Sequence, residues 1–458
     1  MTLIFYILLL WMNAFPPNAY AGEKIKTSDP FLDNLARQNQ LARWMPLNVP
    51  GLKNNRSPNN NELENFQALS YLQGYNPPTK FRNATLYNQN KSFYGYNLLL
   101  SAHAPVAILM DMNGKTIHQW RYPSTSLPVD HRYCADYWDS ARILKDGDLL
   151  ALIPFGGLLR IDKKSNLLWF KRIACHHDFD IDSNGNIYTL TIKNSRSGDN
   201  AGMKVDSITV LSPQGEIKKE ISLYDLFKKY PDPAYINKIN GLSHMEHFFY
   251  SNDGDKIYLS ISVDSFHSNS IIVLDGKWAS KDPSFKKGNL LVSVRNIGIL
   301  ICVDPDKEKI VWLMDTAFWS KGQHFAKLLD NGNILIFDNL YRHDLSRVVE
   351  FDPAAKKIVW DYSSQNGRFF SFIAGQCYRL PNGNTLITES ANGHSFEVTP
   401  DKKIVWEFYN PNQVDKKNAL FSFVNLNQPP GGKYNKLIAM IYRMQRIPID
   451  STLDWLND

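Results

Sequence analysis

The segment "QHFAKLLDNGNILIFDN", Gln323 to Asn339, gives the clearest indication of the fold. Two short runs of mainly apolar residues flank an Asn-Gly dipeptide, and this pattern predicts a β-hairpin with a tight turn. A close copy, "HHDFDIDSNGNIYTL", occupies His176 to Leu190. Both copies have a histidine at the head of the first strand. The repetition indicates an array of similar units.

The same hairpin occurs five times along the chain. Each copy is followed by a second pair of strand-like runs. Together these give four strands, named A to D, in roughly 35 to 50 residues, which is the size of one β-propeller blade. The chain has five such units and one incomplete unit, "AILMDMNGKTIHQW", before them. We therefore predict an all-β protein, a six-bladed β-propeller. The hairpins begin at Ala141, His177, His267, His324 and Gln376.

The incomplete first blade lacks an A strand. The late apolar run "KLIAMIYRM", 436 to 444, could supply it and close the ring, which removes open sheet edges. The propeller is predicted over 93–445, after a short, polar and partly helical N-terminal arm at 22–92. An insertion at 224–261 is placed to cap the channel mouth, and 446–458 form a C-terminal tail.

Tryptophans recur at one fixed position in the D strands. A large aromatic residue at one position per blade is expected to fill the space between neighbouring sheets, in preference to forming a binding stripe. The five residues are Trp120, Trp169, Trp312, Trp360 and Trp406.

Charge and the N-terminus bear on partners and location. The formal charge of +6 is spread over 458 residues without a dense basic tract, which argues against nucleic-acid binding. The chain begins with an apolar run of about a dozen residues, too short for a stable membrane span. Pro16, Pro17 and the small-x-small site Ala19-Tyr20-Ala21 follow. We predict a cleaved signal peptide, 1–21, and a periplasmic or secreted protein, in preference to an uncleaved anchor.

The four cysteines are Cys134, Cys175, Cys302 and Cys377. None has the spacing of a zinc site. Cys302 lies in the apolar run "GILICVD" and is expected to be a buried small residue. Cys134 and Cys175 could form a bridge, which sequence spacing leaves open.

Counting back from the turn glycine of each hairpin compares the heads of the A strands. His324 and His177 each lie eight residues before their glycine, and His267 lies nine before its own. The second blade has Asp139 at this position. Because A strands line the central channel of a propeller, these side chains should converge at one end of it.

The ends of B strands and the starts of C strands belong to the same face of the ring, since neighbouring strands are antiparallel. Arg295 and Arg347 fall there. Three imidazoles with one or two guanidiniums predict an anion site, because clustered positive groups repel one another unless an anion lies among them. A histidine at such a site can act as a nucleophile. A three-histidine metal site is the alternative, disfavoured because an arginine beside a cation is repelled.

These residues, in this order, resemble the bacterial arylsulfate sulfotransferases, which are periplasmic six-bladed propeller enzymes. The resemblance covers roughly 95 to 411. It rests on "HHD" at 176–178, "FHSN" at 266–269, "LLVSVRN" at 290–296, "GQHFAKLLDNGNILIFDN" at 322–339, "SRVVEFD" at 346–352 and "RLPNGNTLI" at 379–387.

The resemblance implies a ping-pong transfer of a sulfuryl group from a small aryl sulfate donor to a phenolic acceptor, without a cofactor or metal. The nucleophile, which forms a sulfohistidine, falls on His324. The other catalytic residues implied are His267, Asn269, Arg295 and His177, with His176 as the less favoured choice for the last histidine. His176, Arg347 and Asp139 are candidate binding residues.

Two departures from the family pattern favour a different class of function. The family has Asp where this chain has Phe325, and the arm at 22–92 does not resemble the family's N-terminal β-domain. The alternative is a non-catalytic secreted propeller that binds an anionic ligand or a partner protein at the channel mouth. The enzyme hypothesis predicts that His177, His267, Arg295 and His324 point into one cavity. It fails if His324 faces the core between the sheets instead.

Overall fold

The computed structural model describes most of the chain from residue 73 onward. The described residues are 73–74, 76–129, 135–194, 203–242, 248–253, 256–261, 263–315, 319, 322–342, 345–364, 369–371, 373–415, 435–449 and 451–457. All belong to the larger of two compact units, Trp44–Asp458, and the smaller unit is Met1–Arg43. The predicted signal peptide, most of the arm and Cys134 lie outside the described residues.

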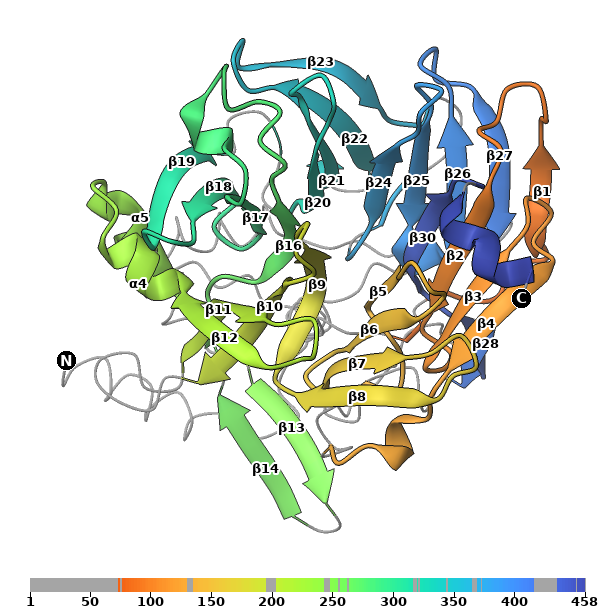
Figure 1. Cartoon of the computed structure of the whole chain (residues 1–458), viewed down its shortest axis with the longest axis horizontal. Coiled ribbons are helices and arrows are strands. Elements are labelled where there is room, and N and C mark those ends of the chain that lie inside the picture. Colours follow the sequence, from red (N-terminus) through yellow and green to blue (C-terminus); the bar gives the residue numbers. More distant parts are fainter. Residues whose placement is uncertain are drawn as a thin grey trace, which may run out of the picture. The chain divides into compact units, whose positions relative to one another are not determined.

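Six antiparallel sheets form the blades of a β-propeller, which confirms the predicted fold (Figure 1). From inner to outer strand, blade 1 is β30 (Ile441–Ile447), β2 (Tyr96–Ser101), β3 (Val106–Met110) and β4 (Thr116–Arg121). Blade 2 is β5 (Ser140–Ile143), β6 (Leu149–Ile153), β7 (Gly157–Ile161) and β8 (Leu167–Arg172). Blade 3 is β9 (Cys175–Ile181), β10 (Ile187–Asn194), β11 (Met203–Leu211) and β12 (Ile217–Ser222).

The remaining blades repeat this order. Blade 4 is β16 (Ser268–Val273), β17 (Leu290–Val294), β18 (Ile299–Asp304) and β19 (Lys309–Asp315). Blade 5 is β20 (His324–Leu328), β21 (Ile334–Arg342), β22 (Leu345–Asp352) and β23 (Lys357–Tyr362). Blade 6 is β24 (Gln376–Arg379), β25 (Thr385–Glu389), β26 (His394–Val398) and β27 (Ile404–Tyr409), with β1 (Asn83–Tyr87) added outside β27.

The core lies between consecutive blades. The middle strands β6, β17 and β25 are buried along their whole length, because each is covered by a neighbouring sheet on both faces. Outer strands such as β8 alternate or are largely exposed. Cys302 is fully buried between blades 4 and 5, as predicted.

The C-terminal strand closes the ring, as expected from its apolar sequence. β30 pairs antiparallel with β2, from Tyr96 opposite Ile447 to Leu100 opposite Arg443. The strand begins at Ile441, later than expected, because β29 (Lys436–Ile438) pairs instead with β28 (Gln413–Asp415). The 3₁₀-helix η6 (Ser451–Asn457) follows, and the Trp455 ring packs against Trp120 at 5.4 Å.

The D-strand tryptophans join successive blades, which confirms their predicted structural role. Trp120 Nε1 donates to Gly147 O at 2.8 Å, and Trp406 Nε1 donates to Met112 O at 2.8 Å. Each acceptor lies in a turn of the next blade. Trp360 makes the same kind of contact with Pro400 O at 3.0 Å.

The hairpin turn of the opening stretch depends on Gly332. Gly332 N donates to Leu329 O at 2.9 Å, and its φ of +86° lies in the left-handed region that favours glycine. A Cβ at this position would lie 2.9 Å from the Trp278 ring. The Asn-Gly turn therefore has a structural explanation.

The insertion contains α4 (Leu223–Lys228), α5 (Pro233–Leu242) and the paired strands β13 (Phe248–Asp253) and β14 (Lys256–Ile261). Ser222 caps α4 by accepting a hydrogen bond from Asp225 N at 3.2 Å. Leu226 and Phe227 pack with residues of blades 3 and 4, and Lys238 Nζ donates to Ile297 O at 2.7 Å. Ile297 follows the end of β17 on the predicted mouth face, but the two helices lie at the outer rim of blades 3 and 4, where α4 contacts β11, β12 and β19 (Figure 1). These helices therefore do not cap the channel as predicted.

The remaining short elements lie in connections. They are η1 (Ser124–Ser126), β15 (Val263–Asp264), η3 (Pro283–Phe285) and η4 (Ser390–Asn392).

Candidate functional site

One cavity lies where the inner strands of all six blades begin or pass. Each blade supplies at least one lining side chain, so the site exists only in the closed ring. The six are Asp139 just before β5, His177 on β9, Asn269 on β16, His324 on β20, Gln376 on β24 and Arg443 on β30.

Four of the predicted site residues line this cavity, whereas the expected His267 and Arg295 are not among its lining residues. His177, His324, Asn269 and Asp139 line the cavity directly. The His267 ring packs against the His177 ring, with centroids 4.8 Å apart. Its backbone oxygen accepts a hydrogen bond from Arg295 N at 3.3 Å, which places the predicted arginine beside this pair.

Two predicted binding residues lie behind the lining. His176 is 2% exposed, and its Nδ1 lies 2.8 Å from His177 Nδ1. The buried His176 side chain therefore packs against His177 on the side away from the cavity lining. Asp206 in turn lies near His176, with Oδ1 3.8 Å from Nε2. Arg347 is paired within its own blade, since its Nε lies 2.8 Å from Asp338 Oδ2. His177 is thus the cavity histidine of the "HHD" motif.

Local backbone geometry aims the histidines. His177 and His267 have φ of 60° and 50°, and Phe325, next to His324, has φ of 54°. Left-handed conformations are costly for such residues and occur here where the pairing of A and B strands is interrupted by bulges. The bulges interrupt the pleat and redirect the A-strand heads. Counting residues back from the turn glycines therefore predicted that the histidines lie at one level of the ring. It did not predict their left-handed backbone conformation.

The protonation state of His324 follows from its contacts. Asn339 Nδ2 donates to the carbonyl oxygens of Ser371, at 2.7 Å, and Ala374, so its Oδ1 must face His324. His324 Nδ1 lies 2.7 Å from that Oδ1 and 3.0 Å from Gly322 O. Both are acceptors, so Nδ1 carries the proton and Nε2 keeps its lone pair.

The electrostatics of the cavity keep these imidazoles neutral. Burial, and then the positive charge of Arg295, hold the pKa of His324 well below its usual range. Burial and the neighbouring His267 and His176 do the same for the pKa of His177. A neutral imidazole beside fixed cationic groups is suited to attack an electrophile that carries negative oxygens.

Asn269 links two neighbouring inner strands. Its Nδ2 donates to Gln323 O at 2.7 Å, directly before His324. Gln323 is fully buried, and its own Nε2 donates to Val294 O at 3.3 Å, next to Arg295. This chain of bonds fixes the backbone of blade 5 against blade 4 at the site. One hydrogen of the Asn269 amide remains available for a ligand.

Phe325 occupies the position where the family has an aspartate. It is 3% exposed, and its ring lies 4.3 Å from Lys327 Nζ and 5.5 Å from the guanidinium carbon of Arg443. Both cations also pair with Asp178, at 3.5 Å and 2.7 Å. Although burial raises it, these two charges hold the pKa of Asp178 below its usual range. The aromatic ring thus contacts the same two cations that pair with Asp178.

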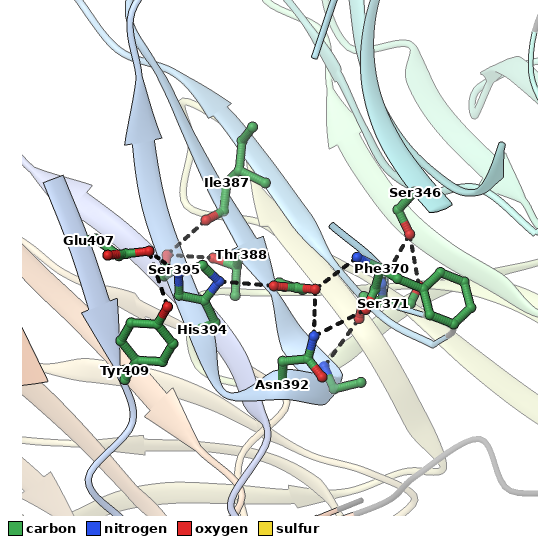
Figure 2. A network of polar contacts seen from close by, with 12 residues as sticks. Ser346, Phe370, Ser371, Ile387, Thr388, Asn392, His394, Ser395, Glu407 and Tyr409 are labelled. Carbon is green, nitrogen blue, oxygen red and sulfur yellow. Dashed lines mark hydrogen bonds and ion pairs between the residues drawn. The ribbon is translucent and has the colours of Figure 1, made fainter. Parts of the chain in front are cut away.

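A buried network of ion pairs supports the segment around Ser371, whose carbonyl oxygen accepts a hydrogen bond from Asn339. His394 donates from Nδ1 to Glu389 at 2.9 Å and from Nε2 to Glu407 at 3.0 Å, so it is an imidazolium with a pKa of about 9. Figure 2 shows His394 between Glu407 and the segment containing Phe370 and Ser371. Glu389 accepts a hydrogen bond from Phe370 N at 2.8 Å. The next residue along supplies the carbonyl that orients Asn339.

Among the site residues that sequence reasoning missed are Asn339, Gln376, Tyr442 and Arg443. Asn339 is the last residue of the segment Gln323 to Asn339. It lies on the mouth face, where antiparallel pairing already predicts the ends of the B strands. Tyr442 and Arg443 lie on the closing strand, which is predicted to line the channel as an A strand. Tyr442 stacks on Tyr137 at 4.7 Å, and Gln376 Nε2 donates to Tyr442 O.

The described part of the chain also bears on metal binding and on membrane insertion. Within it, no group of three or more His, Cys, Asp and Glu side chains is arranged to hold a metal ion. None of its helices combines the length and the apolar character needed to cross a membrane.

Fold and site together define a six-bladed β-propeller with a histidine-rich, cationic cavity on its axis. The chain belongs to the arylsulfotransferase (ASST) family, whose model matches residues 143–411. This confirms the family indicated by the sequence motifs and assigns the chain a general sulfotransferase-type function. No curated protein matches the chain.

Some solved structures are similar to the chain at low identity. A protein of unknown function from Bacteroides caccae is 15% identical, with a TM-score of 0.44, over 69% of this chain and 94% of that one. The Dos1 propeller is 11% identical, with a TM-score of 0.37, over 83% and 88%. A virginiamycin B lyase from Staphylococcus aureus is 11% identical, with a TM-score of 0.34, over 71% and 88%. Similarity at this level carries no argument about function.

Proposed function

We propose that this protein is an exported enzyme that moves a sulfuryl group from an aryl sulfate to a phenolic acceptor by a ping-pong mechanism. In the first half, His324 Nε2 attacks sulfur, the sulfur–oxygen bond to the aryl group breaks and a phenol leaves. In the second half, an acceptor oxygen attacks the sulfohistidine and the bond between nitrogen and sulfur breaks. The sulfohistidine at His324 is therefore the intermediate that the two half-reactions share.

The observation that carries the proposal is the orientation of His324. Two acceptors hold its Nδ1 proton, at 2.7 Å and 3.0 Å, so the lone pair is on Nε2 of a side chain that lines the cavity. A third group that orients a nucleophilic histidine and fixes its tautomer is a recurring requirement of such catalysis.

The neighbouring groups supply charge stabilisation. Negative charge on the sulfuryl oxygens is redistributed during transfer, and Arg295, the imidazoles of His177 and His267 and the amide of Asn269 are the donors at hand. Donors fixed in advance in a buried site stabilise the transition state more than the ground state. We assign these four residues to holding the sulfuryl oxygens.

Export is the second part of the proposal. It rests on the apolar run, the two prolines and the Ala19-Tyr20-Ala21 site of the N-terminus. Cell fractionation and the mass of the recovered protein would test it. A periplasmic or secreted protein that starts near Gly22 supports export, and an intact N-terminus in the cytoplasm contradicts it.

The enzymatic proposal is tested with a chromogenic aryl sulfate and a phenol. Wild type should release the chromogenic phenol in an acceptor-dependent manner, and His324→Ala should lose about 10³-fold or more of this activity. His118→Gln, on the outer strand β4, is a matched histidine control and should remain active.

Trapping the intermediate sharpens the test. With donor alone, the mass of the wild-type chain should increase by one sulfuryl group, and a peptide containing His324 should carry it. If the wild type transfers no sulfuryl group over a broad donor panel yet binds aryl sulfates, the protein is a non-catalytic anion-binding propeller. Labelling at another residue would refute the assignment of His324.

A further inference from the structure

The cavity contains a carboxylate for which the transfer chemistry above has no role. Asp139 precedes β5, lines the cavity together with His324 and is 4% exposed. Its Oδ2 accepts a hydrogen bond from His177 N at 2.9 Å. Among the described residues, no donor bonds to its Oδ1. One oxygen therefore anchors the side chain and the other remains for a ligand.

Sulfuryl transfer between phenols also moves a proton. The acceptor hydroxyl must lose its proton as its oxygen attacks, and a poorly acidic leaving phenol must gain one. His324 cannot serve, because Nε2 carries the sulfuryl group while Nδ1 donates to Gly322 O and Asn339 Oδ1. Guanidinium groups do not act as bases in proteins. The proton needs another site in the cavity.

Asp139 suits this role better than the remaining imidazoles. A proton on His177 would add positive charge beside His267, His176 and Arg295, and these neighbours together with burial hold its pKa well below the usual range. Asp139 instead becomes neutral when it accepts a proton, which burial favours. Burial, with a smaller contribution from Asp178, raises the pKa of Asp139 to about 7. The His177 N–H and Arg443 act in the opposite direction.

The remaining walls fit a neutral aryl hydroxyl. Phe325, Ile373 and Tyr442 line the same cavity and offer apolar surface to a ring. The amide oxygens of Asn269 and Gln376 have no hydrogen-bond donor among the described residues. An occupant with an O–H group could supply one, whereas a second anion would be repelled.

We propose that Asp139 exchanges the proton of the phenolic oxygen in both half-reactions, an inference that rests on the proposed sulfotransferase function. In the acceptor half, the O–H bond breaks and the proton passes to Asp139. The oxygen bonds to sulfur, and the electron pair of the nitrogen–sulfur bond returns to His324. In the donor half, protonated Asp139 gives its proton to the leaving oxygen. The carboxylate is then ready for the next acceptor.

The test compares wild type with Asp139→Asn over aryl sulfate donors whose leaving phenols range from acidic to weakly acidic. Asparagine keeps an oxygen for the His177 N–H but cannot take up the proton. Sulfohistidine formation from nitrophenyl-type donors should change little. Formation from weakly acidic phenols should fall by roughly 10²- to 10⁴-fold, which steepens the dependence on leaving-group acidity. An unchanged dependence overturns the inference.

Controls separate this inference from the proposed function. Asp148→Asn removes a carboxylate charge from the same blade, at a residue paired with Arg160 outside the cavity lining, and should keep the wild-type dependence. Absence of transfer by the wild type defeats the proposed function itself. Transfer that needs His324 but shows no change in Asp139→Asn defeats only the role of Asp139.

A second measurement keeps the inference testable if Asp139→Asn does not fold. For wild type, release of a weakly acidic phenol should depend on a group that must be protonated and that titrates near pH 7. Release of an acidic nitrophenol should lack that dependence. Equal pH profiles for the two donors would overturn the role of Asp139.

Discussion

Asn339 Oδ1 lies 2.7 Å from His324 Nδ1, and this contact determines which nitrogen of the histidine can react. The orientation of the amide is itself set by two carbonyl oxygens, those of Ser371 and Ala374. The backbone carbonyls of Ser371 and Ala374 thus orient Asn339, and Asn339 orients the histidine that we propose as the nucleophile. Such outer contacts determine the reactivity of a histidine as much as its position does.

Replacing Asn339 by alanine should lower kcat by roughly 10- to 100-fold, with little change in KM, because the wrong tautomer becomes populated. Nitrogen NMR of the His324 ring should show mixed tautomers in the variant and one in the wild type. Asn382→Ala, at an exposed hairpin turn, is the matched control. A large change in KM with kcat unchanged would refute an orienting role.

Arg295→Ala should lower kcat by about 10²- to 10³-fold, since one charged donor to the developing negative oxygens is lost. It should also shift the pH profile. The charge of Arg295 disfavours protonation of His324 and lowers its pKa, so its removal raises that pKa. The acid limb of the pH–rate profile should then move to higher pH. Arg295→Lys should return the acid limb part of the way to its wild-type position. An acid limb that does not move in Arg295→Ala would contradict the effect of Arg295 on the pKa of His324.

His394 should make the fold sensitive to alkaline pH. Its pKa in the folded chain is about 9, above the ordinary value of 6.5, because Glu389 and Glu407 outweigh the effect of burial. The stabilisation is therefore complete below pH 6.5 and is lost as pH rises through about 9. It amounts to about 3 kcal/mol at most.

The measurement is the free energy of unfolding of wild type and His394→Gln across this pH range. The difference between the two should shrink toward high pH. Because Glu389 also binds Phe370 N, activity of His394→Gln should fall while the fold persists at neutral pH. A difference that does not vary with pH would show that His394 carries no charge in the folded chain.

Phe325→Leu should destabilise the protein by roughly 1–3 kcal/mol, because the ring facing Lys327 and Arg443 is lost. Phe285→Leu is the control, since Phe285 is similarly buried, at 5% exposed, but packs on Trp312. Denaturant unfolding at low and high salt separates the two effects. Equal losses in both variants would indicate simple packing at Phe325.

The repeat in the sequence was sufficient to predict the blades. Strand runs alternate with turn residues such as Gly332, and a tryptophan recurs in the outer strand of five of the six blades, because each sheet must pack against two neighbours. The same regularity placed His177, His267 and His324 at one level of the ring. These features depend on local pairing and on periodic burial, and both leave a direct pattern in the sequence.

The rest of the site depends on contacts between residues far apart in the chain. Arg443 reaches Asp178 across the ring, and Asn339 is oriented by carbonyls of an irregular segment that no periodicity describes. The positive φ at His177 and the ion pair that holds Arg347 in its own blade likewise arise only on folding. The pattern of residues along the chain is sufficient to predict the family, the six blades and the histidines at the heads of the inner strands. Folding decides which nitrogen of His324 keeps its lone pair and which carboxylate lines the same cavity, because burial and partners from other blades set tautomers and pKa values.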